Sequence, residues 1–292
     1  MKGMITVSDK RVLLILPALI ILFFNSIFPT LIVVNYSFQE PFAAVLKFVG
    51  WDNYIQVLQD HAFLAAFRRN IYFSSVTLVI EILLGLTLAL IIRERGKFAS
   101  IVSAAIILPS LIPYVSIGIL WRLLAMTNGP LSLILKLLGI NYSLMSGSNS
   151  LWTIIIMDVW HWTSLVFLLV SAGLMTIPDV YYTAARVDGA KKWQTFRLIT
   201  MRGLKPMLIL VTLLRIIDSF KIYDENVILT GGGPGRSTEF LSVFLVKKIL
   251  KEWAGGFGAA ASLIYLVQVI VICYIIITLL TKGKGMLERP IQ

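Results

Sequence analysis

The stretch FGAAASLIYLVQVIVICYIIITLL, residues Phe257–Leu280, contains no aspartate, glutamate, lysine, arginine or histidine. A helix rises about 1.5 Å per residue, so this run is long enough to cross a hydrocarbon core of about 30 Å. The whole chain of 292 residues has the same character, because 58% of its residues are apolar and only 14% are charged. A typical soluble domain is about 25% charged. The sequence therefore predicts an integral membrane protein.

Five further apolar runs predict additional membrane helices, so we expect an all-α bundle of about six spans in a single domain, residues 1–292. The runs are Val12–Val34, Ile71–Ile92, Ser100–Trp121, Trp152–Thr176 and Leu204–Phe220. The first run is longer than the apolar part of a secretory signal and no small-residue cleavage site follows it, so we expect it to be retained. Pro109 and Pro113 are expected to bend the third run and to free backbone carbonyls toward a cavity.

The distribution of basic residues predicts the orientation. With six crossings, lysine and arginine are more frequent on the side that holds both chain ends, which places both termini in the cytoplasm. The net charge of +11 suits contact with anionic lipid headgroups, and no aromatic positions interleave with it as a nucleic-acid groove requires. Cys273 is the only cysteine, so a disulfide framework and a cysteine-rich metal site are excluded.

The segment Ile177–Pro206 is too polar to cross a membrane. A short helix is predicted over Val180–Val187, and Gly189 stands where a left-handed helix cap is needed. A second helix is predicted over Lys191–Ile199. Ala184 and Ala185, if exposed on one turn, would let another protein approach the backbone closely. The alternative is an amphipathic helix that lies at the headgroups.

The same segment resembles the cytoplasmic "EAA" loop of permease subunits in ABC importers for sugars and related solutes. The shared residues are Ile177-Pro178, Ala184-Ala185, Asp188-Gly189-Ala190, Phe196, Ile199-Thr200 and Pro206. The sequence departs from the family pattern at Thr183, where an acidic residue is usual, and at Met201-Arg202, where Leu-Pro is usual. The resemblance implies that coupling helices seat on an ATPase subunit through Thr183, Ala184, Ala185, Asp188, Gly189 and Ala190.

The resemblance extends along most of the chain. Further matching segments are Phe48–Tyr54, Leu108-Pro109 with Ile112-Pro113 and Trp121, Leu229–Thr238 and Gly256–Ser262. It implies an inner-membrane permease of a bacterium or archaeon that pairs with a second permease, two ATPases and an extracytoplasmic solute-binding protein. The solute would be a sugar, a polyol or a glycerol-phosphate-like molecule, moved by alternating access. This chain would hold no cofactor, because ATP and magnesium would bind to the partner subunits.

A glycine cluster from Gly231 to Ser237 superficially suggests a phosphate-binding loop. That loop requires G-x-x-x-x-G-K-[ST], and with Gly235 as the second glycine the first glycine is replaced by Thr230 and the lysine by Arg236. The cluster also follows a membrane span rather than a buried strand. It is therefore either a flexible turn or, as the resemblance implies, a contact with the solute-binding protein through Gly231, Gly232, Gly233 and Pro234.

Polar residues inside the predicted spans give two further alternatives. Arg215, Asp218 and Lys221 share one helix face by their spacing, so they either pair along the helix or line a polar pathway. On the fourth span, the aromatic residues around His161 either anchor the helix at the membrane interface or stack on a sugar ring. The candidate pathway residues are Asp158, Trp160, His161, Arg215 and Asp218.

Other functional classes have weaker support. Glu81 and Asp218 would suit a secondary transporter driven by an ion gradient. A membrane enzyme would need acid-base groups such as Asp158 and His161 to converge with these carboxyl groups. The sequence contains no metalloprotease H-E-x-x-H motif, no G-x-S-x-G elbow and no acidic cluster for a divalent metal. We therefore expect a transport subunit without enzymatic activity of its own.

Overall fold

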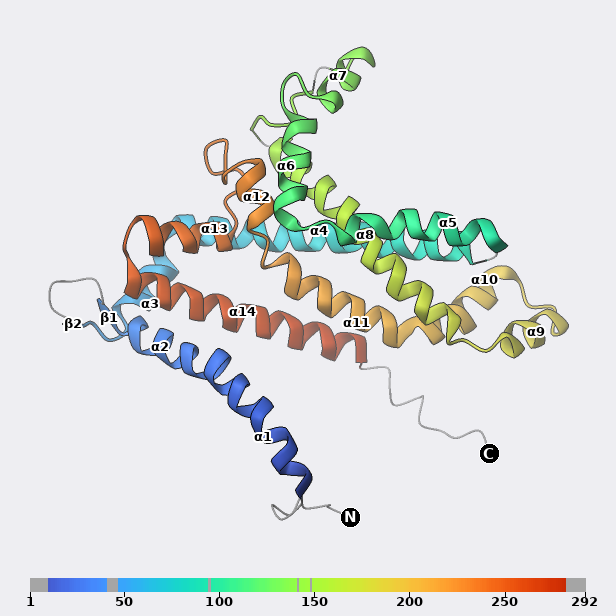
Figure 1. The fold of residues 1–292 in the computed structure, drawn as a ribbon, viewed down its shortest axis with the longest axis horizontal. Coiled ribbons are helices and arrows are strands. Elements are labelled where there is room, and N and C mark those ends of the chain that lie inside the picture. The colour runs from blue at the N-terminus through green and yellow to red at the C-terminus, as the bar shows by residue number, and fades with distance from the viewer. Residues whose placement is uncertain (1–9, 41–46, 94–95, 141, 148, 282–292) are drawn as a thin grey trace. The chain divides into compact units, whose positions relative to one another are not determined.

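The computed structural model describes residues 10–40, 47–93, 96–140, 142–147 and 149–281, which are mostly helical (Figure 1). The described residues within 1–64 and 245–267 form one compact unit, and the described residues within 65–244 and 268–292 form the other. The chain ends at 1–9 and 282–292, whose cytoplasmic placement the charge pattern predicts, lie outside the described residues.

Five of the described helical segments are long and apolar enough to cross a membrane. They are Ile15–Ser37, His61–Ile92, Tyr114–Leu137, Asn149–Met175 and Gly255–Leu279. The predicted fifth span, Leu204–Phe220, corresponds to helix α11 (Met201–Ser219), which is not one of these five. Four charged residues in α11 lower its hydropathy: Arg202, Lys205, Arg215 and Asp218.

The first unit begins with a helical stretch that contains α1 (Lys10–Leu22), the π-helical turn η1 (Phe23–Ile27) and α2 (Phe28–Ser37). A short antiparallel ribbon follows, in which β1 (Gln39–Glu40) pairs with β2 (Lys47–Phe48). The unit also contains α3 (Asp52–Gln59), the start of α4 (His61–Ile92), η4 (Lys247–Lys251) and the first part of α14 (Gly255–Thr281).

Asn53 holds the first unit together at the end of α2. Its buried amide donates hydrogen bonds to the carbonyl oxygens of Ser37, at 3.0 Å, and Gln39, at 3.1 Å. Gly256 lies against the same point, because an added Cβ would stand 2.0 Å from the Gln39 carbonyl oxygen. These contacts give a structural reason for the Phe48–Tyr54 and Gly256–Ser262 motifs.

The second unit contains the remaining helices. Their bounds are α5 (Gly96–Ile107), η2 (Leu108–Leu111), α6 (Tyr114–Ala125), α7 (Pro130–Leu137), α8 (Asn149–Met175), α9 (Asp179–Val187), α10 (Lys192–Thr195), η3 (Phe196–Thr200), α11, α12 (Asp224–Leu229) and the start of α13 (Leu241–Val246). α8 is the most buried of the candidate spans and packs against α11, α5 and α6. It therefore forms the centre of this unit.

Two apolar clusters form the core of the second unit. One surrounds Phe73, Ile154 and Phe240, and the other surrounds Val166, Phe167 and Leu204. Helices α4 and α8 approach closely beside the second cluster, because a Cβ added at Gly85 would lie 2.6 Å from Cγ1 of Val166. Small residues permit such close packing where lipid supplies no hydrophobic force between helices.

Two predicted helix boundaries are wrong. The run Ser100–Trp121 is not one helix, because the chain is extended at Ile112 and Pro113 between η2 and α6. Proline disfavours helical geometry in the residue before it, so the bend expected at Pro109 and Pro113 is a complete break. The helix predicted over Lys191–Ile199 does not end there, since α10 continues through η3 directly into α11.

Candidate functional site

Arg215 lies at the centre of a buried cluster of charged residues that joins three helices. Its Nε donates to Oε2 of Glu81 on α4 at 2.6 Å, and its Nη2 donates to Oε1 of the same carboxylate at 2.8 Å. Nη2 also donates to Asp158 on α8 at 2.8 Å, and Nη1 donates to Asp218 on α11 at 3.2 Å. The bidentate pair with Glu81 has the geometry that gives arginine its strong carboxylate contacts.

The cluster contains three carboxyl groups and one guanidinium group. Side-chain exposure is 1% for Arg215, 0% for Glu81, 4% for Asp158 and 28% for Asp218. Burying charge without a partner is expensive, so the cation stabilises the two fully buried carboxylates. Asp218 alone of the three reaches an accessible surface, where its carboxylate can accept further hydrogen bonds.

The helix-face prediction for this cluster is partly wrong. Arg215 and Asp218 do pair along α11, but α11 ends at Ser219 and Lys221 lies beyond it. The shortest ion pairs of Arg215 are instead with Glu81 and Asp158 on other helices. Glu81 was expected as a polar residue within a span, but not as a member of the pathway set. Its charge inside an apolar helix was the available signal.

Aromatic rings lie beside the cluster. The Arg215 guanidinium lies 4.4 Å from the ring centre of Trp162, a cation–π contact. The ring of His161 is 5.7 Å from Tyr114 and perpendicular to it, and Tyr114 also lies 6.1 Å from Trp162. The structure thus surrounds Arg215 with hydrogen-bonding groups and flat apolar surfaces.

Trp160 has different neighbours from the other candidate pathway residues. Its ring is 6.0 Å from Trp121, and it lines a pocket of about 290 Å³ with Leu84, Pro109 and Ser164. Consecutive positions on a helix differ in direction by about 100°, so Trp160 and Trp162 point to different sides of α8. Asp158, Arg215 and Asp218 form one cluster, which His161 borders through the aromatic rings, whereas Trp160 packs elsewhere.

The segment Ile177–Pro206, which we call the docking loop, has the expected helix and cap. α9 begins at Asp179 and ends at Val187, and Gly189 has a φ of +68°. The N–H of Ala190 donates to the Ala185 carbonyl oxygen at 2.9 Å, which closes the turn. No atom lies within 4 Å of a Cβ added at Gly189, so glycine is needed for its backbone conformation rather than for space.

The exposed surface of this loop differs from the expected one at Ala185. Ala184, Thr183 and Asp188 are exposed, whereas Ala185 is only 7% exposed. The two alanines were expected to lie side by side on the surface, but successive helical residues point about 100° apart. Ala185 therefore packs within the chain, and of the two adjacent alanines only Ala184 is exposed.

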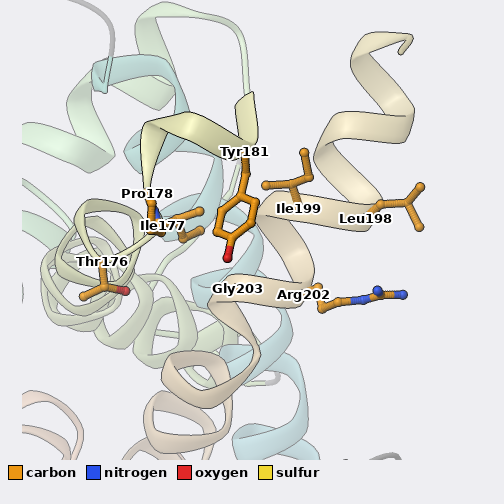
Figure 2. A pocket seen from close by; sticks show the side chains of 8 residues that line it. All are labelled: Thr176, Ile177, Pro178, Tyr181, Leu198, Ile199, Arg202 and Gly203. Atoms are coloured by element: carbon orange, nitrogen blue, oxygen red, sulfur yellow. The ribbon is translucent and has the colours of Figure 1, made fainter. Parts of the chain in front are cut away.

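A pocket of about 410 Å³ separates α9 from the start of α11 (Figure 2). Figure 2 shows the Tyr181 ring between Ile177 and Ile199, while Arg202 points away. The absence of a side chain at Gly203 lets α11 approach Ile177 closely, because an added Cβ would lie 2.7 Å from Cδ1 of Ile177. The hydroxyl groups of Tyr182 and Thr200, 3.1 Å apart, also join the two segments.

The glycine cluster after α12 is a hydrogen-bonded turn. Gly231, Gly232 and Gly235 have positive φ values of 64°, 89° and 64°. Thr238 is buried, and its hydroxyl donates to the Gly233 carbonyl oxygen at 3.0 Å and lies 2.7 Å from the hydroxyl of Thr230. A pocket of about 420 Å³ beside the turn is lined by Arg122, Gly231, Gly233 and Pro234, among others. The turn thus has a fixed shape that another protein can recognise.

Residues 81–284 match the family described as the inner-membrane component of binding-protein-dependent transport systems. The chain belongs to this family. The match includes the Arg215 cluster, the docking loop and the glycine turn. With its candidate spans, membership identifies a multi-pass inner-membrane transport permease, as the sequence resemblance implied.

Several relatives of this permease are named as sugar transport proteins. It is 35% identical to the trehalose/maltose permease MalF of Thermococcus litoralis over 76% of each chain. It is 31% identical to the trehalose permease SugA of Mycobacterium tuberculosis, over 80% of this chain and 75% of that one. It is 28% identical to the arabinooligosaccharide permease AraP of Bacillus subtilis, over 89% of this chain and 84% of that one.

A solved structure has the same fold. A chain of a bacterial ABC transporter for the import of alginate superposes with a TM-score of 0.82 at 19% identity, over 94% of this permease and 96% of that chain. The all-α permease fold predicted from the sequence is thereby confirmed.

Proposed function

We propose that this chain forms half of the translocation pathway of an ATP-driven importer for a sugar or a related polyol or glycerol-phosphate solute. The observation that carries the proposal is the Arg215 cluster, in which a partly exposed carboxylate stands beside aromatic rings on the central helices of the second unit. The relatives named above transport trehalose, maltose or arabinooligosaccharides, which supports a carbohydrate as the solute.

The chemistry of the cluster suits a carbohydrate. Sugar hydroxyl groups donate hydrogen bonds to carboxylates, and the resulting charge-assisted bonds are stronger than neutral ones. Asp218 is the accessible acceptor, while Arg215, held by Glu81 and Asp158, keeps it in place. The Tyr114 and Trp162 rings supply apolar faces for the C–H side of a sugar ring. A second permease subunit completes the pathway.

The docking loop supplies the connection to ATP. The exposed residues of α9, with the turn at Gly189, seat on one of two partner ATPases, which bind ATP and magnesium. Closure of the ATPases favours the outward-facing arrangement, because a partner shifts a conformational equilibrium only when it binds the two states differently. Both termini then lie in the cytoplasm together with the loop.

The glycine turn lies on the extracytoplasmic side, opposite to the docking loop, and contacts a solute-binding protein there. Gly231, Gly232, Gly233 and Pro234 present mainly backbone groups, which a partner surface can approach closely. A bacterial alginate ABC transporter with a similar fold has been solved in complex with a periplasmic protein that carries an alginate pentasaccharide. That complex supports a contact of this type.

Uptake by proteoliposomes tests the proposed function. The chain is reconstituted with its second permease, ATPases and binding protein, and uptake of labelled maltose and trehalose is followed with and without ATP. We expect uptake only with ATP and all partners. Uptake that the chain alone drives from a sodium or proton gradient would show a secondary transporter instead. Chemical conversion of the sugar by the chain alone would show an enzyme.

A further inference from the structure

A second pocket of the second unit lies where two candidate membrane spans end. It has a volume of about 440 Å³, and its lining residues come from the end of α4, the start of α5, the end of α8 and the start of α9. Its lining includes Arg93, Asp179 and the three serines Ser100, Ser103 and Ser171. The Arg215 cluster and the glycine turn contribute no residue to it.

Arg93 is the cation that lines this pocket, and its ion pair with the rest of the protein is weak. Its Nη2 lies 3.3 Å from Oδ1 of Asp179, a side chain that is 92% exposed. An ion pair at such an exposed position contributes little stability, because water and salt screen it. The guanidinium group also lies 4.3 Å from the ring centre of Tyr182, which holds it at the pocket. It can therefore bind an anion without losing a strong internal contact.

Three serine hydroxyl groups complete the polar lining. Within the part of the chain that the structure describes, the hydroxyl groups of Ser100, Ser103 and Ser171 form no hydrogen bond. Serine in a membrane helix commonly donates back to the preceding helical turn, as Ser110 and Ser262 do here. Hydroxyl donors beside a guanidinium group are the chemistry that recognises a phosphate group.

The position of the pocket indicates where such a phosphate comes from. The apolar part of α4 ends at Ile92 and that of α8 ends at Met175, and both residues line the pocket. The ends of membrane spans lie at the depth of the lipid headgroups. Met175, which is 87% exposed, adds an apolar surface that an acyl chain can cover and a free phosphate ion would not use.

We propose that this pocket binds the phosphate group of an anionic phospholipid, with Arg93 and the serine hydroxyls as donors and the apolar surface of Met175 against the acyl chain. Asp179 is the competing acceptor for Arg93. The lipid then binds beside the ends of α4 and α8, at the base of the docking loop.

Native mass spectrometry of the full chain tests the site directly. The chain is purified from nanodiscs that contain phosphatidylglycerol and phosphatidylcholine with identical acyl chains, and the retained lipid is counted. We expect preferential retention of phosphatidylglycerol, and a reduction of about fivefold in Arg93→Gln, as loss of one basic group beside an anionic lipid implies. Arg197→Gln removes an equal charge from an exposed residue that does not line the pocket, and should leave retention unchanged.

Asp179→Asn separates lipid binding from a purely structural ion pair. If Arg93 binds the lipid, this variant frees the guanidinium group and retention should stay equal or rise. If the ion pair only holds α9 in place, Asp179→Asn and Arg93→Gln should reduce retention equally, and the proposal fails. Ser103→Ala keeps every charge and should also reduce retention.

Three other results would overturn the proposal. Equal retention of the two lipids would show that the pocket does not select an anionic headgroup. Equal losses in Arg93→Gln and Arg197→Gln would show only attraction between the lipid and the overall basic surface. Displacement of phosphatidylglycerol by inorganic phosphate alone would show a site for a free anion rather than for a lipid.

Discussion

Replacing Arg215 should lower the stability of the folded protein more than replacing its ion-pair partner Glu81. The reason is that three carboxyl groups share one guanidinium group. Arg215→Gln leaves two buried carboxylates, Glu81 and Asp158, without their cation. Loss of one partner from a buried ion pair costs about 3–5 kcal/mol. Glu81→Gln leaves Arg215 paired with Asp158 and Asp218. It removes the charge assistance of two hydrogen bonds, about 1 kcal/mol each.

The thermal unfolding midpoint of each purified variant in the same lipid measures this difference. A change of 1 kcal/mol shifts the midpoint of a large domain by about 2–4 °C. The expected decrease is therefore about 6–20 °C for Arg215→Gln and about 4–8 °C for Glu81→Gln. Thr212→Ala, on the same helix but outside the cluster, is the control and should shift by no more than about 2 °C. A decrease in Glu81→Gln equal to or larger than that in Arg215→Gln would refute the charge-balance reasoning.

Three further predictions concern the docking loop, the pathway and a buried carboxyl group. Gly189→Val places a β-branched residue at a φ of +68°, at a cost of about 1–2 kcal/mol, and should reduce ATP-coupled uptake while membrane insertion persists. Gly189→Asn tolerates this conformation and is the control; normal uptake in the valine variant would contradict the coupling role. Asp218→Asn should assemble normally but weaken solute recognition, measured as uptake per assembled complex over a range of solute concentrations. Poor assembly with normal uptake per complex would make Asp218 purely structural. Burial raises the pKa of Glu225 from 4.5 to about 7. The folded state therefore holds this proton more tightly than the unfolded state, so the unfolding midpoint should decrease as the pH rises from about 5 to about 8. An equal decrease in Glu225→Gln would exclude Glu225 as its cause.

Features encoded by neighbouring residues could be predicted from the sequence. The α9 helix and its cap at Gly189 follow from a local pattern, a short amphipathic segment before a glycine. The apolar helices follow from hydropathy, since lipid leaves backbone groups no partner except within the helix. The break at Pro113 was only partly predictable, because a proline in a membrane helix produces either a kink or an end.

Features that depend on distant residues could not be predicted in the same way. Glu81 and Arg215 are 134 positions apart, and no local pattern shows that they meet. The separation of Trp160 from the cluster and the burial of Ala185 depend on which side of each helix faces a neighbour. For α8, which is apolar on most of its sides, hydropathy carries little information about which side faces a neighbour.

The Arg215 cluster therefore combines two requirements that usually conflict. Helices in lipid gain little from apolar contact with one another, so polar contacts between them carry part of the association. Glu81 and Asp158 meet this requirement by fixing α4 and α8 to Arg215 on α11. The second requirement is an acceptor that remains accessible to a solute. The third carboxyl group, that of Asp218, accepts a hydrogen bond from Arg215 and is partly exposed. The buried ion pairs thus hold the helices, and Asp218 is the acceptor that we propose for the solute.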